Sequence, residues 1–177
     1  MLIVFSGLPG SGKTTLAREL AKARGAVYLR IDSIEQAIRN ADNRMKEVGR
    51  SGYCVANELA ASNLDLGSTV VADCVNPVAE SREAWRNVAA RAGVALVNIQ
   101  VICSDPREHQ RRVETRTVDV PGLTPPTWQS VLAHDYEVWD CAPFTLDTAT
   151  LSCAQAVAII VERFFPVHTQ ADDSSEN

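Results

Sequence analysis

Short apolar runs alternate with longer stretches of helical periodicity along this chain. The runs cover residues 2–5, 26–31, 69–72, 94–103 and 144–146, and each is typical of a buried strand. Between them, apolar side chains recur every three or four residues, as on one face of a helix. Strands that alternate with helices in this way predict a parallel sheet covered on both faces, which is an α/β protein with three α/β/α layers and five strands.

The helical stretches carry start and stop signals. Ser33 is the N-cap expected after the second strand, and Asp105-Pro106 opens a very polar helix after the fourth. Thr127 is expected to cap a helix that carries Trp128, Val131, Leu132 and Trp139. For a helix over 53–66 the inward positions are expected to be Val55, Leu59 and Leu66. For a last helix near 152–165 they are expected to be Ala154, Val157, Ala158, Val161 and Phe164.

Length and composition limit the class of protein. With 177 residues and 46% hydrophobic content, the chain suits one domain, which we expect over residues 1–166, followed by a disordered acidic tail over 167–177. No run approaches the roughly 20 apolar residues of a membrane span, and no leader precedes the first strand, so a cytoplasmic protein is expected. The net charge of −5 does not favour a general nucleic-acid binder. The five cysteines, without a C-x-x-C pair, predict no zinc site or disulfide framework.

A glycine-rich motif directly follows the first apolar run. The pattern G-x-x-x-x-G-K-[ST] is matched by Gly7, Leu8, Pro9, Gly10, Ser11, Gly12, Lys13 and Thr14. Its glycines let backbone N–H groups point inward with no Cβ in the way, and the following helix adds its positive N-terminal end. Lys13 can reach the β- and γ-phosphates of a nucleotide, and the Thr14 hydroxyl can bind Mg²⁺. The motif therefore predicts a site for ATP and Mg²⁺ that extends to Thr15.

Two aspartates follow the second and third predicted strands. Ligands of a parallel sheet bind at the carboxyl ends of its strands, so we expect Asp32, Asp73 and the phosphate-binding loop to converge in one cleft. A carboxylate there can accept the proton of a hydroxyl that attacks a phosphoryl group, and we assign this role to Asp32. Asp73 is expected to hold Mg²⁺ through water or to bind substrate, and capping of the turn at Asn76-Pro77 is its alternative role.

Arginines on the polar helix are candidates for phosphate contact. Arg107 and Arg111 are expected to form surface ion pairs, because Glu108 lies beside them. Arg112 and Arg116 precede a segment broken by prolines and glycine, which is typical of a closing lid. We therefore expect a lid over about 105–127 whose Arg112 and Arg116 reach the transferring phosphoryl group.

A further group of side chains is expected on the acceptor side. Arg39 and Tyr53 are candidates for substrate binding together with Arg30, although a surface pair with Glu35 explains Arg39 equally well. The three histidines show no metal-ligand spacing, so no catalytic role is expected for them.

With these features the chain resembles the small bacterial P-loop kinases, which are often described as AAA-type ATPases. This group is similar to chloramphenicol phosphotransferase, gluconate kinase, the zeta-type toxins and the kinase half of polynucleotide kinase. The resemblance covers roughly residues 1–165. It implies that Asp32 is the general base, that Arg112 and Arg116 contact phosphates, and that Thr148, in the loop after the last strand, borders adenine.

The resemblance implies an ATP-dependent phosphotransferase that moves the γ-phosphate to a hydroxyl of a small-molecule acceptor, as a monomer or homodimer. A polynucleotide or nucleotide kinase and a zeta-like toxin kinase are alternatives, and a regulatory ATP-binding switch is the alternative from another class. Residues 119–122 match D-x-x-G, which switches use, but no apolar strand precedes them, so we interpret the match as chance. No signature in the sequence identifies the acceptor.

Overall fold

Five parallel strands form the centre of the protein. The computed structural model describes residues 1–41 and 48–166, so the expected tail lies outside the described residues. The sheet has the order β2-β3-β1-β4-β5, and all four strand pairs are parallel, as predicted. Its strands are β1 (Leu2–Ser6), β2 (Val27–Arg30), β3 (Val70–Asp73), β4 (Leu96–Ile102) and β5 (Phe144–Asp147).

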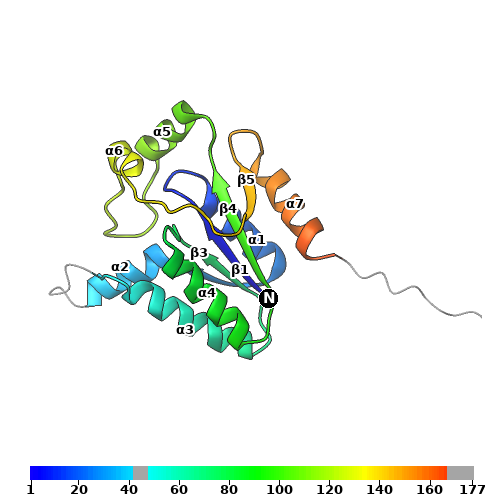
Figure 1. Ribbon diagram of the computed structural model, residues 1–177. Helices are drawn as coiled ribbons and strands as arrows, with labels where there is room; N and C mark the ends of the chain where they lie inside the picture. Colours follow the sequence, from blue (N-terminus) through cyan, green and yellow to red (C-terminus); the bar gives the residue numbers. More distant parts are fainter. Residues whose placement is uncertain (42–47, 167–177) are drawn as a thin grey trace, which may run out of the picture.

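Helices cover both faces of this sheet (Figure 1). One face carries α1 (Lys13–Arg24) and α7 (Cys153–Phe164). The other carries α2 (Ile31–Ala41), α3 (Ser51–Asp65) and α4 (Ala79–Arg91). The central strand β1 is buried throughout, with Leu2 and Val4 in one core and Ile3 and Phe5 in the other. This alternation follows from the two-residue period of a strand and produces two apolar layers. The predicted three-layer α/β/α arrangement is confirmed.

Two short helices stand above the carboxyl ends of the strands, α5 (Pro106–Thr115) and α6 (Trp128–Leu132). The Asp105 side chain caps α5 by accepting hydrogen bonds from the N–H groups of Arg107 and Glu108. The residues between these helices, 116–127, form neither helix nor strand and are called the lid segment below. The Thr127 cap is confirmed, but α6 ends at Leu132, so it does not extend to Trp139.

Several predicted helix details are wrong. Helix α2 begins at Ile31, directly after β2, so Ser33 lies in its first turn and is not an N-cap. The core positions expected for the helix over 53–66 are exposed: Val55 and Leu59 lie in α3, and Leu66 follows its last residue. The buried residues of α3 are Gly52, Ala56, Ala60, Ala61 and Leu64. Small side chains form this buried face because α3 packs closely between α2 and α4. A prediction based on large apolar residues therefore selects the exposed face of α3.

The face of α7 is also partly misassigned. Ala156 and Ile160 are its buried residues, whereas Ala154 and Ala158 are exposed. The other three expected positions, Val157, Val161 and Phe164, pack at the edge of the core. Among the described residues, none of the helices has the length and apolar character needed to cross a bilayer.

Candidate active site

The phosphate-binding loop connects β1 to α1 and needs its glycines for two separate reasons. Gly10 and Gly12 have φ angles of 83° and 95°, in the left-handed region that other residues rarely adopt. A Cβ on Gly10 would also lie 2.5 Å from Cγ2 of Val113 on α5. Lys13 is the first residue of α1 and is buried, with Thr14 half-buried beside it. The loop therefore presents a helix N-terminus and a lysine at the carboxyl end of the sheet.

Helix α5 rests directly on this loop. The ring nitrogen Nε2 of His109 lies 2.8 Å from the Pro9 carbonyl oxygen, and its ring meets Trp128 edge-on at a centroid distance of 5.2 Å. Together with the contact between Val113 and Gly10, this bond holds the base of the lid on the loop. Nothing in the sequence predicts this contact of His109, which joins α5 to the loop.

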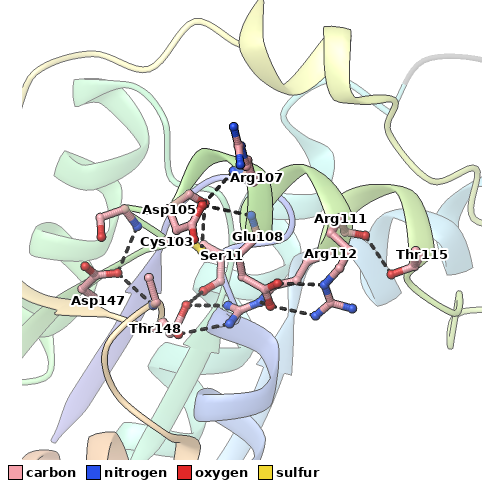
Figure 2. Close-up of polar contacts among 12 residues, drawn as sticks. Ser11, Cys103, Asp105, Arg107, Glu108, Arg111, Arg112, Thr115, Asp147 and Thr148 are labelled. Carbon is pink, nitrogen blue, oxygen red and sulfur yellow. Dashed lines mark hydrogen bonds and ion pairs between the residues drawn. The ribbon is translucent and has the colours of Figure 1, made fainter.

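Arg112 joins α5 to the turn after β5 (Figure 2). Its Nη1 donates to the Thr148 hydroxyl at 2.7 Å, and Nη2 donates to the Thr148 carbonyl at 3.1 Å. The same hydroxyl lies 2.7 Å from the carbonyl oxygen of Ser11. Hydrogen bonds from Arg111 and then from Arg112 lower the pKa of Glu108 to about 2. Three residues predicted for the nucleotide site, Ser11, Arg112 and Thr148, are thus brought together.

Arg30 connects three carboxylates at the other end of the site. Its side chain is 3% exposed, and its Nη2 donates to Asp32 Oδ2 at 3.1 Å. Its Nη1 donates to Asp119 Oδ1, in the lid segment, at 2.8 Å. The Nε lies 3.8 Å from Asp73 Oδ2, which accepts a hydrogen bond of 2.7 Å from the Tyr28 hydroxyl. Burial, reinforced by the Asp73 charge, raises the pKa of Tyr28, so this hydroxyl remains a donor.

A cavity of about 520 Å³ lies between the loop, α2 and the lid. Nine of the predicted site residues line it, namely Gly10, Gly12, Lys13, Thr14, Thr15, Arg30, Asp32, Arg112 and Arg116. Gly7, Leu8 and Ser11 line a neighbouring cavity of about 320 Å³ instead. Thr148 lines a third cavity, of about 290 Å³, which it shares with Gly12, Thr15 and Arg112. The phosphate-binding loop therefore borders all three cavities, and Asp32 lines the one of about 520 Å³.

Three predicted substrate residues do not line the large cavity. Asp73 is 2% exposed and lies behind Arg30 at the end of β3. Arg39 forms the ion pair with Glu35 that its spacing allowed, at 3.4 Å. The Tyr53 hydroxyl accepts a hydrogen bond of 2.9 Å from the backbone N–H of Asn76. In this structure these contacts fix the surrounding framework.

Sequence reasoning missed five residues of the cavity wall, and two of them, Arg18 and Asp119, form an ion pair there; the other three are Arg111, Thr115 and Thr117. Arg18 follows Thr14 by four residues, which is about one turn of α1. This spacing could have predicted that Arg18 lies on the cavity side of the helix. Asp119 had no such signal. Its carboxylate contacts Arg18 Nη2 at 2.5 Å as well as Arg30, and this depends on the path of the lid segment across the sheet. The D-x-x-G match at this position coincides with that ion-paired turn.

The residues present fit a nucleotide and a magnesium ion. A loop whose glycines leave no room for a Cβ, followed by Lys13 and Thr14 at a helix N-terminus, is suited to a polyphosphate. Thr14 offers a hydroxyl to Mg²⁺ at the cavity wall. Within residues 1–41 and 48–166, no group of three or more His, Cys, Asp or Glu is arranged to hold a metal. A magnesium ion would therefore be held jointly with the phosphates.

Comparisons with known proteins agree with this geometry. The family described as "AAA domain" matches residues 2–124, and the chain belongs to that family. A protein of Chloroflexus aurantiacus j-10-fl inferred to be a kinase has a TM-score of 0.71 at 20% identity, with 91% of this chain and 93% of that chain covered. No curated protein matches the chain significantly by sequence.

Two further solved structures share the fold. A gluconokinase from Sinorhizobium meliloti 1021 has a TM-score of 0.60 at 20% identity, with 90% of this chain and 93% of that chain covered. The APS kinase CysC of Mycobacterium tuberculosis, in complex with AMPPNP and APS, has a TM-score of 0.59 at 17% identity, with 91% and 95% covered. The chain therefore has the fold of the P-loop kinases.

Proposed function

We propose that this protein is an ATP-dependent phosphotransferase that moves the γ-phosphate of ATP to a hydroxyl of a small-molecule acceptor. One observation carries the proposal: Lys13 and Thr14 of the phosphate-binding loop and the Asp32 carboxylate line the same cavity. A group that holds phosphate and a group that accepts a proton are thus placed across one space, which is the arrangement that phosphoryl transfer needs.

The chemistry follows from the groups around this cavity. The acceptor hydroxyl oxygen attacks the γ-phosphorus, the bond from that phosphorus to the β–γ bridging oxygen breaks, and ADP leaves. Asp32 accepts the proton of the hydroxyl as the new P–O bond forms. Lys13, Arg112 and Arg116 line the cavity and stabilise the charge on the transferring group. Mg²⁺, when bound with the nucleotide, neutralises part of the same charge.

The surroundings of Asp32 favour an acceptor over water. Arg30 holds one oxygen of this carboxylate, Oδ2, so the group has a fixed orientation beside the cavity. Residues of α5 and Thr117 and Asp119 of the lid segment form one side of this open cavity. Closure of the lid segment over a bound acceptor would exclude bulk water and support transfer to a hydroxyl more than hydrolysis. Its volume of about 520 Å³ and the net charge of −5 support a small molecule rather than a long polymer.

The test is transfer of label from γ-labelled ATP to pooled small metabolites. We expect a labelled product with the wild-type protein and none with Lys13→Ala. Asp32→Asn should keep ATP affinity and lose about 10²-fold or more in turnover; turnover at the wild-type rate would refute the assignment of Asp32 as base. Label that moves only to oligonucleotide 5′ ends would replace the proposal with a polynucleotide kinase. Release of phosphate without an acceptor, together with a nucleotide-dependent partner, would indicate a switch.

A further inference from the structure

The ion pairs of Asp119 indicate which chemical class of acceptor the site takes. The two cations that hold its carboxylate belong to regular elements, Arg18 to α1 and Arg30 to β2. Asp119 itself lies in the lid segment and its side chain is 37% exposed. The backbones of both arginines are therefore positioned by regular elements, although the Arg18 side chain is 42% exposed, and the carboxylate comes from a segment that is neither helix nor strand.

The geometry of the contacts is that of a carboxylate site. Arg30 Nη1 lies 2.8 Å and 2.9 Å from the two oxygens of Asp119, and Arg18 Nη2 lies 2.5 Å from Oδ2. Guanidinium groups that meet a carboxylate in this way make short, charge-assisted hydrogen bonds. Partial burial raises the pKa of Asp119, but hydrogen bonds from Arg30 and Arg18 outweigh it and lower the pKa to about 2. The side chain is therefore an anion throughout the physiological range.

The position of this receptor relative to Asp32 matters most. The guanidinium of Arg30 holds Asp119 through Nη1 and Asp32 through Nη2. A ligand carboxylate in the place of the Asp119 side chain would therefore lie next to Asp32, on the wall that also contains Lys13. A hydroxyl one or two carbons from that carboxylate would reach the carboxylate that we assign as the base.

We propose that Arg18 and Arg30 form a clamp for the carboxylate of a hydroxy-acid acceptor, and that Asp119 occupies the clamp until the acceptor displaces it. This inference rests on the proposed phosphotransferase function and names the acceptor class of the same cavity. The exchange conserves charge, because one carboxylate replaces another. It requires only the Asp119 side chain to turn away, since the adjacent Val120 is buried and keeps the lid segment in place. The cavity favours anions in any case, because six cationic side chains and two carboxylates line it.

The test measures binding of defined probes to the full-length protein by isothermal titration calorimetry. The probes are D-glycerate and D-gluconate, with glycerol and sorbitol as the matched alcohols that lack the carboxylate. Asp119→Asn removes the competing charge, so it should bind at least one acid about tenfold more tightly than wild type. Arg18→Gln should bind that acid about tenfold more weakly, and the alcohols should not respond to either change. Asp65→Asn, on the exposed end of α3, is the charge-matched control.

Each outcome decides the inference. If Asp119→Asn binds neither acid more tightly than wild type, the carboxylate is only a structural contact and the clamp is overturned. The clamp is also overturned if Asp119→Asn increases the affinity for glycerol or sorbitol as much as the affinity for the acids. The proposed phosphotransfer is judged separately, by the formation of phosphorylated acid with ATP. If the acids bind in the expected pattern and no label moves to them or to pooled metabolites, the clamp stands as a carboxylate site and the phosphotransferase proposal fails.

Discussion

Arg82 stacks on Trp139, with its guanidinium carbon 4.1 Å from the ring centroid, although the two residues lie 57 positions apart in the chain. The arginine is 1% exposed and donates to backbone carbonyls of two separated stretches. These acceptors are the carbonyl oxygens of Asn76, Pro77, Glu137 and Val138. Arg82 therefore fixes the segment after α6 onto the turn that follows β3.

This arrangement predicts a large stability loss for Arg82→Lys, even though the charge is retained. A lysine cannot span four carbonyls or stack as a plane, and it would leave buried carbonyls without donors. We expect the free energy of unfolding, measured in urea, to fall by about 2 kcal/mol or more. Arg86→Lys, on the same helix but in a partly exposed pair with Glu83, should change it by less than about 1 kcal/mol. Equal effects of the two changes would contradict this account of Arg82.

Gly10→Ala is predicted to weaken nucleotide binding through α5. The alanine would adopt a left-handed φ and would also overlap Val113. Gly25→Ala is the matched control, because Gly25 also has a positive φ, of 58°, but an added Cβ there meets no atom within 4 Å. Both changes should cost about 1 kcal/mol in backbone strain, and only Gly10→Ala should lower affinity for ATP, by about tenfold. Equal affinities of the two variants, measured by titration with a fluorescent nucleotide, would show that the loop tolerates movement of α5.

Thr148→Val tests the link between the turn after β5 and the phosphate-binding loop. Valine keeps the shape of threonine but loses the hydroxyl that Arg112 and the Ser11 carbonyl contact. We expect a loss of about 1–2 kcal/mol in the free energy of unfolding and a higher KM for ATP, because the loop and Arg112 lose a common partner. Thr145→Val, at an exposed position of β5, should leave the KM for ATP unchanged. A wild-type KM in Thr148→Val would remove Thr148 from the nucleotide site.

The pKa of Asp119 predicts a pH dependence of stability. Its folded-state pKa, about 2, lies below the ordinary value of 3.8, because the bonds from Arg30 and Arg18 outweigh partial burial. The stabilisation is therefore fully present above pH 3.8 and is lost as the pH falls through 2. The difference in unfolding free energy between wild type and Asp119→Asn should be constant from pH 7 to 5 and shrink between pH 4 and 2. A difference that grows on acidification would reverse the sign and contradict the ion pairs.

Local patterns in the sequence were sufficient for much of the fold. Each strand is a short apolar run, and the cap of α5 follows from Asp105-Pro106 alone, because both signals depend on neighbours in the chain. The face of α3 was predicted wrongly, since alanines carry little hydrophobic signal and their burial is decided by how closely α2 and α4 approach. The distance between neighbouring helices cannot be predicted from the pattern of large apolar side chains.

The site divides in the same way. The loop was predicted from its motif, Asp32 from its place after a strand, and Arg112 from its place before the segment broken by prolines and glycine. The contact of Arg30 with Asp119 joins residues 89 positions apart and depends on how the lid segment crosses the sheet. Asp73 was placed correctly at the end of β3, but its side chain is held by Tyr28 at the back of Arg30. Side-chain partners of this kind are set by packing and have no local signature.

The contact between Thr148 and Ser11 has a consequence for shortened forms of the protein. The stretch that matches the AAA domain ends at residue 124, before β5, Thr148 and α7. A truncated chain ending there would keep every residue of the phosphate-binding motif but would make β4 an edge strand, still paired with β1 and open to self-association on its other side. It would also uncover the apolar side of α1 that α7 shields. The family match over residues 2–124 therefore omits residues that the phosphate-binding loop needs to keep its shape, among them Thr148.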